Sequence, residues 1–247
     1  MKSTKKKPAI KIILVEPNGP INVGSIARLC SNFKVDQLRI VSPRCDIHSL
    51  EAKKMALKGF SYIQNSEIFN NLIDAIADCE LALASCGRIE LTESRKIPLE
   101  NISNWVKKFK NINNLAIIFG REDRGLTKKE LLMAQKIFNI QTDLNCPSLN
   151  LSHAVSIVLY ELNRNPYKKI NKKKFNLDIP TSKQIEESFN DIEKLLLETE
   201  YLLPHTSNAK INKFKEFILR SQTTKDELNT IRGMVHQINW ALKNIDF

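Results

Sequence analysis

One stretch near the N-terminus has the residue types of a site that binds an anionic group. Residues 22–28 read Asn-Val-Gly-Ser-Ile-Ala-Arg. Asn22 can cap a helix, Gly24 permits close approach, and Arg28 lies one helical turn after Gly24 on the same face. The planar guanidinium of such an arginine can grip a phosphate. Taken alone the motif is weak, because a capped helix with a surface arginine is common.

A second stretch places charged residues between two glycines. Residues 119–127 read Phe-Gly-Arg-Glu-Asp-Arg-Gly-Leu-Thr, a pattern that turns on Gly120 and Gly125 and opens a helix at Thr127. Thr127 followed by Glu130 three positions later is the pattern of a capping box, which supports a helix start there. The four charged residues between the glycines are more than a simple turn needs.

The third stretch, residues 145–161, joins a polar turn to an apolar helix. Ser148 or Asn150 can accept a hydrogen bond from a free N–H group of the first helical turn. Apolar residues then recur at the spacing of one helical face, at Leu151, Ala154, Val155, Val158, Leu159 and Leu162. Ile157 and Tyr160 make the opposite side apolar too, so this helix is expected to be covered by its own sheet and, as one option, by a second subunit. The simpler interpretation is a capped strand-to-helix connection.

These stretches need a scaffold that brings them together, and hydrophobic periodicity predicts one. Short apolar runs alternate with helical patterns, which is typical of an α/β domain with a parallel sheet covered on both faces. The expected strands are residues 10–15, 37–41, 81–85, 115–119 and 137–140. The expected helices between them are residues 22–32, 51–57, 71–77, 99–108 and 127–134.

Glycine placement predicts where a ligand would bind. Four of the seven glycines lie at strand ends or in the adjoining turns and helix entries, namely Gly24, Gly87, Gly120 and Gly125. Open α/β sheets bind ligands at the carboxyl ends of their strands, so a site is expected at this edge. Turn and capping chemistry alone is the alternative explanation.

The C-terminal third is predicted to be a linker and a helical extension. Lys168 to Lys174 include five lysines and no acid, and we take residues 166–180 as a basic linker after a first domain of residues 1–165. Three amphipathic helical patterns follow within residues 181–247 and suit a small appended module. The lysine run is either a solvated hinge or a patch that tracks RNA phosphates.

Composition bounds the class of partner. Lysine and arginine number 38 against 27 acids, and the net charge of +11 favours a polyanion, with nucleic acid as the first candidate. A chain rich in Lys, Asn and Ile, as an AT-rich genome produces, carries such charge without any binding role. No apolar run approaches the ~18 residues of a membrane span. Five scattered cysteines are typical of reduced thiols in a cytoplasm, and no second pair completes the zinc spacing begun by Cys45 and His48, so no metal is expected.

Standard nucleotide and hydrolase signatures are missing from the sequence. There is neither a G-x-G-x-x-G after a strand nor a G-x-x-x-x-G-K-[ST], which argues against a dinucleotide fold and a phosphate-gripping ATPase loop. His153 lies inside the expected helix and no serine stands in a nucleophile elbow. A Ser-His-Asp hydrolase is therefore unsupported.

The order of the three motifs resembles that of a known family. Asn-x-Gly-x-x-Ala-Arg at residues 22–28, Phe-Gly-Arg-Glu-x-x-Gly-Leu-Thr at 119–127 and Ser-Leu-Asn-Leu-x-x-Ala-Val at 148–155 are similar to motifs of the SPOUT superfamily of RNA methyltransferases. The resemblance is to the ribose 2'-O branch, most closely to the TrmJ type that acts on tRNA position 32, and covers residues 10 to about 165. Two stretches of the tail agree more loosely, residues 203–206 and 228–233.

The resemblance implies a fold, a cofactor and an assembly. It implies a deep trefoil knot at the end of the α/β domain, S-adenosylmethionine held in the knotted loops, and a homodimer whose site takes residues from both subunits. Relatives usually have small polar residues in place of Cys86 and Pro147, so backbone contacts are expected there. Carried over residue by residue, the cofactor contacts are Ser85, Cys86, Gly87, Gly120, Ile140, Pro147, Ser148 and Leu149.

The implied reaction is 2'-O-methylation of a tRNA ribose at position 32. The family assigns an essential role to the arginine that matches Arg28, and because a guanidinium stays protonated we expect Arg28 to clamp the phosphate beside the target and favour the developing alkoxide rather than act as a base. Alternatives are another tRNA position, ribosomal RNA, or a non-catalytic RNA-binding member. The residues expected to position ribose and loops are Asn22, Glu122, Ser148 and Asn150.

Overall fold

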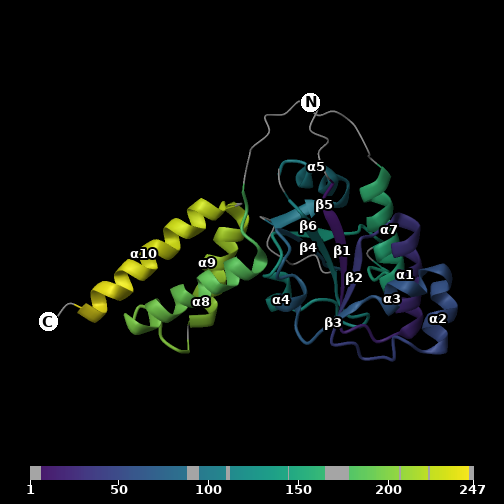
Figure 1. Cartoon of the computed structure of the whole chain (residues 1–247), viewed down its shortest axis with the longest axis horizontal. Helices are drawn as coiled ribbons and strands as arrows, with labels where there is room; N and C mark the ends of the chain where they lie inside the picture. Colours follow the sequence, from purple (N-terminus) through teal and green to yellow (C-terminus); the bar gives the residue numbers. More distant parts are fainter. Residues whose placement is uncertain are drawn as a thin grey trace.

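A parallel sheet forms the centre of the molecule. The computed structural model describes residues 7–87, 95–109, 112–143, 145–164, 178–205, 207–221 and 223–244. Its seven strands lie in the order β3-β2-β1-β6-β4-β7-β5, and all neighbours pair in parallel (Figure 1). The predicted parallel α/β architecture is confirmed. The strands are β1 (Ala9–Val15), β2 (Gln37–Val41), β3 (Glu67–Phe69), β4 (Leu81–Ser85), β5 (Lys96–Pro98), β6 (Asn114–Phe119) and β7 (Lys136–Asn139).

Five of these strands match the apolar runs in the sequence, whereas the two edge strands do not. β3 and β5 have three residues each and stand at opposite edges of the sheet. Pro98 in β5 lacks an N–H group, which an edge strand tolerates. Neither strand contains the continuous apolar run that reveals a buried strand, so periodicity did not predict them.

One face of the sheet is covered by helices that include those of the first and third motifs. Ile12 and Leu14 of β1 point into this core, whereas Ile13 and Val15 point to the opposite face, as the alternation of a strand requires. On the opposite face, α4 (Leu72–Ala75) and α6 (Lys128–Leu131) are single-turn helices, shorter than their sequence patterns predicted. The larger core is built with η1 (Leu57–Gly59), η3 (Leu99–Asn101), α1 (Pro20–Phe33), α2 (Leu50–Ala56), α3 (Phe60–Gln64), α5 (Ile102–Val106) and α7 (Leu151–Arg164) (Figure 1).

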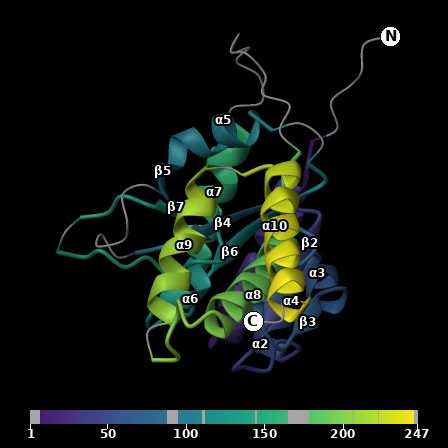
Figure 2. The same cartoon turned by 90° about the vertical axis from the view of Figure 1, so that its left-hand side faces the viewer.

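Three helices near the C-terminus form a separate small core. Its apolar residues include Phe189 of α8, Ile218 of α9 and Leu228 of α10 (Figure 2). The expected helical extension is thus confirmed, and α8 begins with the capping box of Thr181 and Gln184. The helices are α8 (Ser182–Glu198), α9 (Ser207–Ser221) and α10 (Lys225–Asn244).

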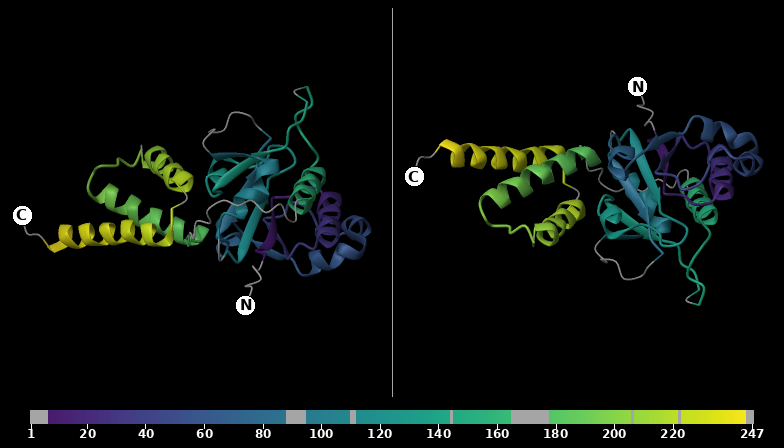
Figure 3. Two further views of the ribbon diagram at one scale, coloured as in Figure 1. Left: turned by 90° about the horizontal axis from the view of Figure 1, so that it is seen from above. Right: turned by 90° about the horizontal axis from the view of Figure 1, so that it is seen from below.

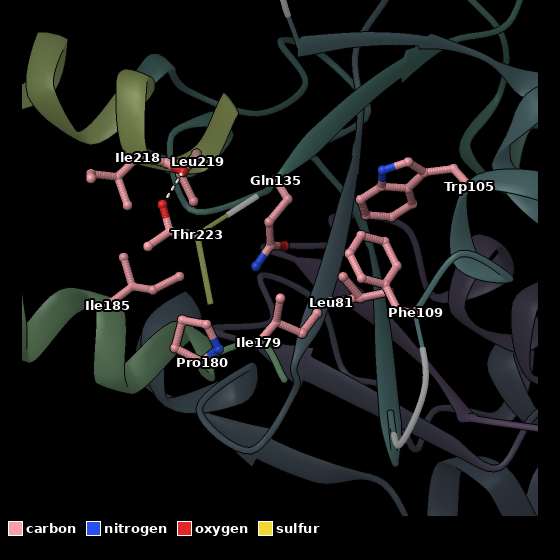
Figure 4. Close-up of a pocket in the computed structure, with 10 residues that line it drawn as sticks. All are labelled: Leu81, Trp105, Phe109, Gln135, Ile179, Pro180, Ile185, Ile218, Leu219 and Thr223. Carbon is pink, nitrogen blue, oxygen red and sulfur yellow. Dashed lines mark hydrogen bonds between the residues drawn. The ribbon is translucent and has the colours of Figure 1, made fainter. Parts of the chain in front are cut away.

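The extension meets the sheet along a narrow seam. Ser182 N donates a hydrogen bond to Cys79 O at 3.2 Å, and Arg95 Nη2 lies 3.6 Å from Glu216 Oε1. A cavity of about 20 Å³ at this seam has room for about one water molecule, so it does not suit a cofactor. The lysine run Lys168–Lys174 lies outside the described residues, and the division at residues 165 and 180 stays a prediction. The residues around the cavity include Leu81, Trp105, Phe109, Ile179, Ile185 and Leu219 (Figure 4).

Candidate active site

The three motif stretches meet in one chain of hydrogen-bonded side chains at the carboxyl edge of the sheet. Glu122 Oε1 accepts a hydrogen bond from Asn22 Nδ2 at 3.0 Å, and Asn22 Oδ1 accepts one from Asn150 Nδ2 at 2.9 Å. These bonds join residues that are 100 and 128 positions apart in the sequence. We call Glu122, Asn22 and Asn150 the Asn22 network. It contains three of the residues that were expected to position the ribose.

The direction of the Asn22 network follows from Glu122. An ionised carboxylate only accepts hydrogen bonds, so Asn22 must turn its NH2 group toward Glu122 and its carbonyl oxygen toward Asn150. Asn150 then presents its own NH2 group to Asn22, and its oxygen remains for helix α7. Each amide has a single orientation that satisfies both of its neighbours.

Glu122 also completes the N-terminus of α1. The helix begins at Pro20 with Gly19 as its N-cap, and Gly19 has no side chain to accept the unpaired N–H groups. The Glu122 carboxylate accepts hydrogen bonds from the backbone nitrogens of Asn18 at 3.0 Å and Gly19 at 3.1 Å, the two residues just before the helix, where its charge also suits the helix dipole. The prediction that Asn22 caps this helix is wrong. Because proline is favoured as the first helical residue, Asn22 lies inside the first turn, and its side chain bridges the motifs.

Asn150 is the residue that starts α7. Its Oδ1 accepts hydrogen bonds from Ser152 N at 2.8 Å and His153 N at 3.4 Å. The sequence left Ser148 and Asn150 as alternatives for this role, and the geometry assigns it to Asn150. Ser148 is exposed and forms no hydrogen bond with the described residues, so the single chain does not join it to the Asn22 network.

Arg28 stands apart from the Asn22 network, on a closely packed part of α1. A Cβ added at Gly59 would lie 2.6 Å from Arg28 Cα and 2.4 Å from Ala27 O, so only glycine allows the turn at η1 to approach α1 this closely. The Arg28 side chain is exposed and forms no hydrogen bond or ion pair within the described part of the chain. Arg28 is therefore a solvated cation on a firmly seated helix.

Two of the four glycines at this edge serve packing. A Cβ at Gly24 would lie 2.3 Å from Ala52 O of α2, and a Cβ at Gly120 would lie 2.3 Å from the carbonyl carbon of Gly125. Both close approaches are thus to the protein's own backbone. Gly125 has a φ of 69°, which explains glycine at that turn. Gly87 has neither constraint, because a Cβ there would meet nothing within 4 Å and its φ is not in the left-handed region.

A buried ion-pair network lies beneath the loop that carries Glu122. Arg121 is only 8% exposed, and its Nη1 and Nη2 each lie 2.9 Å from an oxygen of the Glu130 carboxylate. Arg121 also binds Glu16, the residue that follows β1. Glu130 forms the predicted capping box with Thr127, which is confirmed. We call Glu16, Arg121 and Glu130 the Arg121 network, and it ties the end of β1 to the start of α6.

The Arg121 network shifts the pKa values of its members. Hydrogen bonding to Arg121 lowers the pKa of Glu16. Burial alone would raise the pKa of Glu130, but hydrogen bonds from Arg121 and Thr127 hold that pKa below its ordinary value. Sequence reasoning missed Glu16 and gave Arg121 no role. The available signal was an acid directly after one apolar strand and an arginine just past another.

The expected cofactor residues begin at the ends of three neighbouring strands. Ser85 is the last residue of β4, Gly120 follows β6, and Ile140 follows β7. The order β6-β4-β7 within the sheet places these three strand ends next to each other. Parallel strands end at the same edge, so the sheet itself gathers these positions.

The turn after β4 is held in place by β7. Cys86 N donates to Phe138 O at 2.9 Å, and Cys86 O accepts from Asn139 Nδ2 at 2.8 Å. Cys86 is thus fixed through its backbone, and Gly87 follows it as an exposed residue. The connection between β7 and α7 projects from the sheet (Figure 3), and all six residues from 145 to 150, including Pro147 and Leu149, are exposed in the single chain.

The sequence matches a known family over the part that carries this site. The match to the SpoU rRNA methylase family spans residues 9–160. The chain belongs to this family. The chain is also similar to the tRNA (cytidine-2'-O-)-methyltransferase TrmJ of Sulfolobus acidocaldarius. The two are 41% identical over 168 residues, which cover 65% of this chain and 68% of that protein. The resemblance to the TrmJ type of SPOUT methyltransferase is confirmed.

Solved structures share the fold of this SpoU-family chain. The crystal structure of TrmJ from Z. mobilis aligns with a TM-score of 0.80 at 24% identity, across 95% of this chain and 100% of that one, so the alignment includes the helical extension. An AdoMet-bound rRNA methyltransferase from Sinorhizobium meliloti aligns with a TM-score of 0.53 at 21% identity, across 66% of this chain and 59% of that one.

The described ranges contain neither a candidate metal site nor a candidate membrane span. Within them no group of His, Cys, Asp and Glu side chains could hold a metal ion. Nor does any helix of the described chain have the length and apolar character needed to cross a membrane.

Proposed function

We propose that this SpoU-family chain transfers a methyl group from S-adenosylmethionine to a ribose 2'-hydroxyl of tRNA in the cytoplasm, at position 32 of the anticodon loop. The observation that carries the proposal is the Asn22 network, which unites the three motif stretches at the ligand-binding edge of an open α/β sheet. The activity named for the Sulfolobus acidocaldarius relative and the net charge of +11 support an RNA substrate.

The residues at the strand ends fit S-adenosylmethionine. Open space beside Gly87 lets a ligand approach the backbone closely, and Ile140, partly buried against the main core, offers an apolar wall. When bound, the cofactor supplies a methyl group that is attached to a sulfonium. Transfer of this methyl group needs no metal. The residues proposed to hold it are Ser85, Cys86, Gly87, Gly120, Ile140, Pro147, Ser148 and Leu149.

Arg28 has the properties that the reaction needs beside the target nucleotide. A ribose hydroxyl is a weak nucleophile that must be placed in line and relieved of its proton. The exposed Arg28 guanidinium clamps the neighbouring phosphate, and its charge favours the alkoxide that develops on the ribose. Because a guanidinium keeps its proton, Arg28 does not act as the base.

The Asn22 network gives this chemistry its geometry. It fixes the N-termini of α1 and α7 against each other, and so sets Arg28 on one helix relative to Ser148 just before the other. Glu122 supports the arrangement from the loop after β6. Ser148 and Asn150 are proposed to orient the ribose.

A homodimer with a trefoil knot belongs to the same proposal. Tyr160 is 58% exposed and Ile157 is 37% exposed on the side of α7 that the sheet does not cover, and Ile21 of α1 is 51% exposed. A second subunit that covers this apolar surface would also enclose the exposed residues 145–150. Light scattering should give the mass of a dimer, and Tyr160→Glu should shift it toward the monomer.

One experiment tests the proposed reaction directly. The protein is incubated with unmodified tRNAs and labelled S-adenosylmethionine, and ribose methylation is mapped nucleotide by nucleotide. The expected result is a 2'-O-methyl group at position 32. A label at another tRNA position, or only on ribosomal RNA, would replace the proposed target.

Calorimetry separates the proposed enzyme from a non-catalytic RNA-binding protein of the same fold. S-adenosylmethionine should release or absorb heat on binding, with one site per subunit. A titration without heat at several temperatures, together with tight RNA binding, would favour the non-catalytic alternative.

A further inference from the structure

Helix α9 presents basic and aromatic side chains along one exposed stripe. Lys210, Lys213, Phe217 and Arg220 recur at the spacing of a single helical face, and all four are exposed. Tyr201, in the turn before α9, is 66% exposed and lies with its ring 5.0 Å from Lys210 Nζ. We call these five residues the α9 stripe.

The α9 stripe is a local concentration of positive charge in an otherwise acidic module. Residues 181–247 contain nine lysines and arginines against ten acids, so the extension as a whole does not share the positive charge of the chain. Helix α9 contains four basic residues and one acid, Glu216. Glu216 lies 3.6 Å from the buried Arg95 of the sheet domain, which offsets its charge. Lys210, Lys213 and Arg220 therefore dominate the field along this face.

Phe217 of the stripe is held in place by aromatic neighbours. Phe217 is 51% exposed, and its ring stacks on Phe214 with a centroid distance of 6.3 Å and an interplanar angle of 8°. Phe214 in turn packs edge-on against the buried Phe189 at 5.6 Å. Arg220 lies 5.9 Å from the Phe217 centroid on the same face. Phe217 is thus a flat, preorganised surface beside a cation rather than a loosely exposed side chain.

We propose that the α9 stripe binds unpaired nucleotides of the substrate RNA, with bases stacked on Phe217 and Tyr201 and phosphates held by Lys210, Lys213 and Arg220. Aromatic faces that alternate with basic side chains are the combination that single-stranded nucleic acid requires, because each base offers a flat face and each phosphate a charge. Paired RNA hides its bases, so the aromatic residues select loops over helices. The inference rests on the proposed function only in taking RNA as the substrate.

The structure favours RNA over two other occupants. A membrane-binding helix needs a broad apolar face toward the lipid. The apolar face of α9, with Ile211, Ile218 and Leu219, is instead buried in the core of the extension. A second copy of the chain could pair its acidic α8 with the cations of the stripe. Such a contact would leave the exposed flat rings of the stripe without a partner.

A fluorescence experiment tests the stacking. Phe217→Trp is introduced into a Trp240→Phe background, so that Trp105, 4% exposed, is the only other tryptophan. An RNA hairpin with an unpaired loop should quench the new emission, whereas a fully paired duplex of equal length should not. Absence of quenching at hairpin concentrations that saturate binding would overturn the proposal. Quenching by anionic vesicles alone, or a change that depends only on protein concentration, would reassign the stripe to lipid or to a second copy.

Affinity measurements without cofactor separate stacking from charge. Phe217→Leu keeps an apolar contact with Phe214 but loses the flat face, so hairpin affinity should fall about tenfold with an unchanged salt slope. Lys213→Ala should make the negative slope of log K against log salt shallower by about 0.7. Phe217→Tyr should restore affinity, and Trp240→Ala, which removes a similarly exposed aromatic residue from α10, should not change it. Equal affinities for Phe217→Leu and the parent would contradict the proposal.

These outcomes are independent of methyl transfer. If labelled tRNA carries no ribose methyl group but the hairpin still quenches the emission of the Phe217→Trp variant, the proposed reaction fails and the RNA surface stands. If methylation at position 32 occurs while the Phe217→Leu and Lys213→Ala variants bind RNA normally, the proposed reaction stands and the RNA surface fails.

Discussion

Two carboxylates at the same edge of the sheet are used for different purposes. Glu122 is exposed and accepts hydrogen bonds from Asn18, Gly19 and Asn22 around the start of α1. The Glu16 side chain is 19% exposed and pairs with Arg121, which also binds Glu130 below the surface. The Arg121 network holds two strand ends and a helix together, whereas the Asn22 network sets the relative positions of groups that face the substrate. A comparison of variants in the two networks should therefore separate stability from activity.

The largest effect on stability is expected from breaking the Arg121 network. Arg121→Ala leaves Glu16 and Glu130 without their shared partner in a partly buried site, so the free energy of unfolding should fall by about 3 kcal/mol. Urea denaturation measures it. Arg124→Ala is the matched control, because the half-exposed Arg124 lies 3.7 Å from Glu16 and an exposed pair contributes about 0–1 kcal/mol. Equal losses in the two variants would contradict the assigned difference between buried and exposed arginines.

The largest effect on activity is expected from Arg28. Arg28→Ala removes the phosphate clamp, and kcat/KM for tRNA methylation should fall by about two to three orders of magnitude, while the free energy of unfolding stays nearly unchanged because the side chain is exposed. Arg28→Lys keeps the charge without the planar fork and should lose less. Near-normal turnover in the alanine variant would eliminate the proposed role.

A smaller effect, on both properties, is expected from reversing the polarity of the Asn22 network. Asn22→Asp places a second acceptor against Glu122, so the start of α1 should loosen by about 1–3 kcal/mol and methylation should slow about tenfold. Asn18→Ala is the control, because Asn18 contributes only its backbone N–H to Glu122. A normal rate in the aspartate variant would show that the network does not position the site.

The smallest effect is expected from acid. The pKa values of Glu16 and Glu130 are lowered in the folded chain, so the stability that they contribute is complete above the ordinary glutamate pKa and is lost as pH falls through their lowered values. Unfolding free energies between pH 7 and about 3 should fall less steeply in Glu130→Gln than in the parent. An identical pH dependence in the two proteins would mean that the Arg121 network does not lower the pKa of Glu130 in the folded chain.

Local patterns were enough to predict the main elements. Apolar runs located β1, β2, β4, β6 and β7, and the Thr127 capping box marked a helix start, because strand burial and capping depend on residues close in sequence. The edge strands β3 and β5 were missed since three residues without an apolar run carry no periodicity. The Asn22 cap was assigned wrongly because Pro20, two residues earlier, satisfies the start of α1 better.

The contacts within the candidate site could not be predicted from local patterns. The motifs named Asn22, Glu122 and Asn150 as positioning residues, but not that they bond to each other, since hydrogen bonds across 100 and 128 positions depend on how the sheet folds. Glu16 was missed for the same reason, because its partner Arg121 lies 105 positions away.

The sequence by itself determined the parallel α/β class, the family and the polar residues at the strand ends, because periodicity, capping and motif order act over short distances along the chain. Only the tertiary structure decided which of those residues touch. It joined Asn22 to Glu122 and to Asn150, buried Arg121 between two carboxylates, and left Arg28 in solvent. The physical reason is that parallel strands end at one edge of a sheet, and their order there, which follows from packing rather than from local pattern, chooses the neighbours of each side chain.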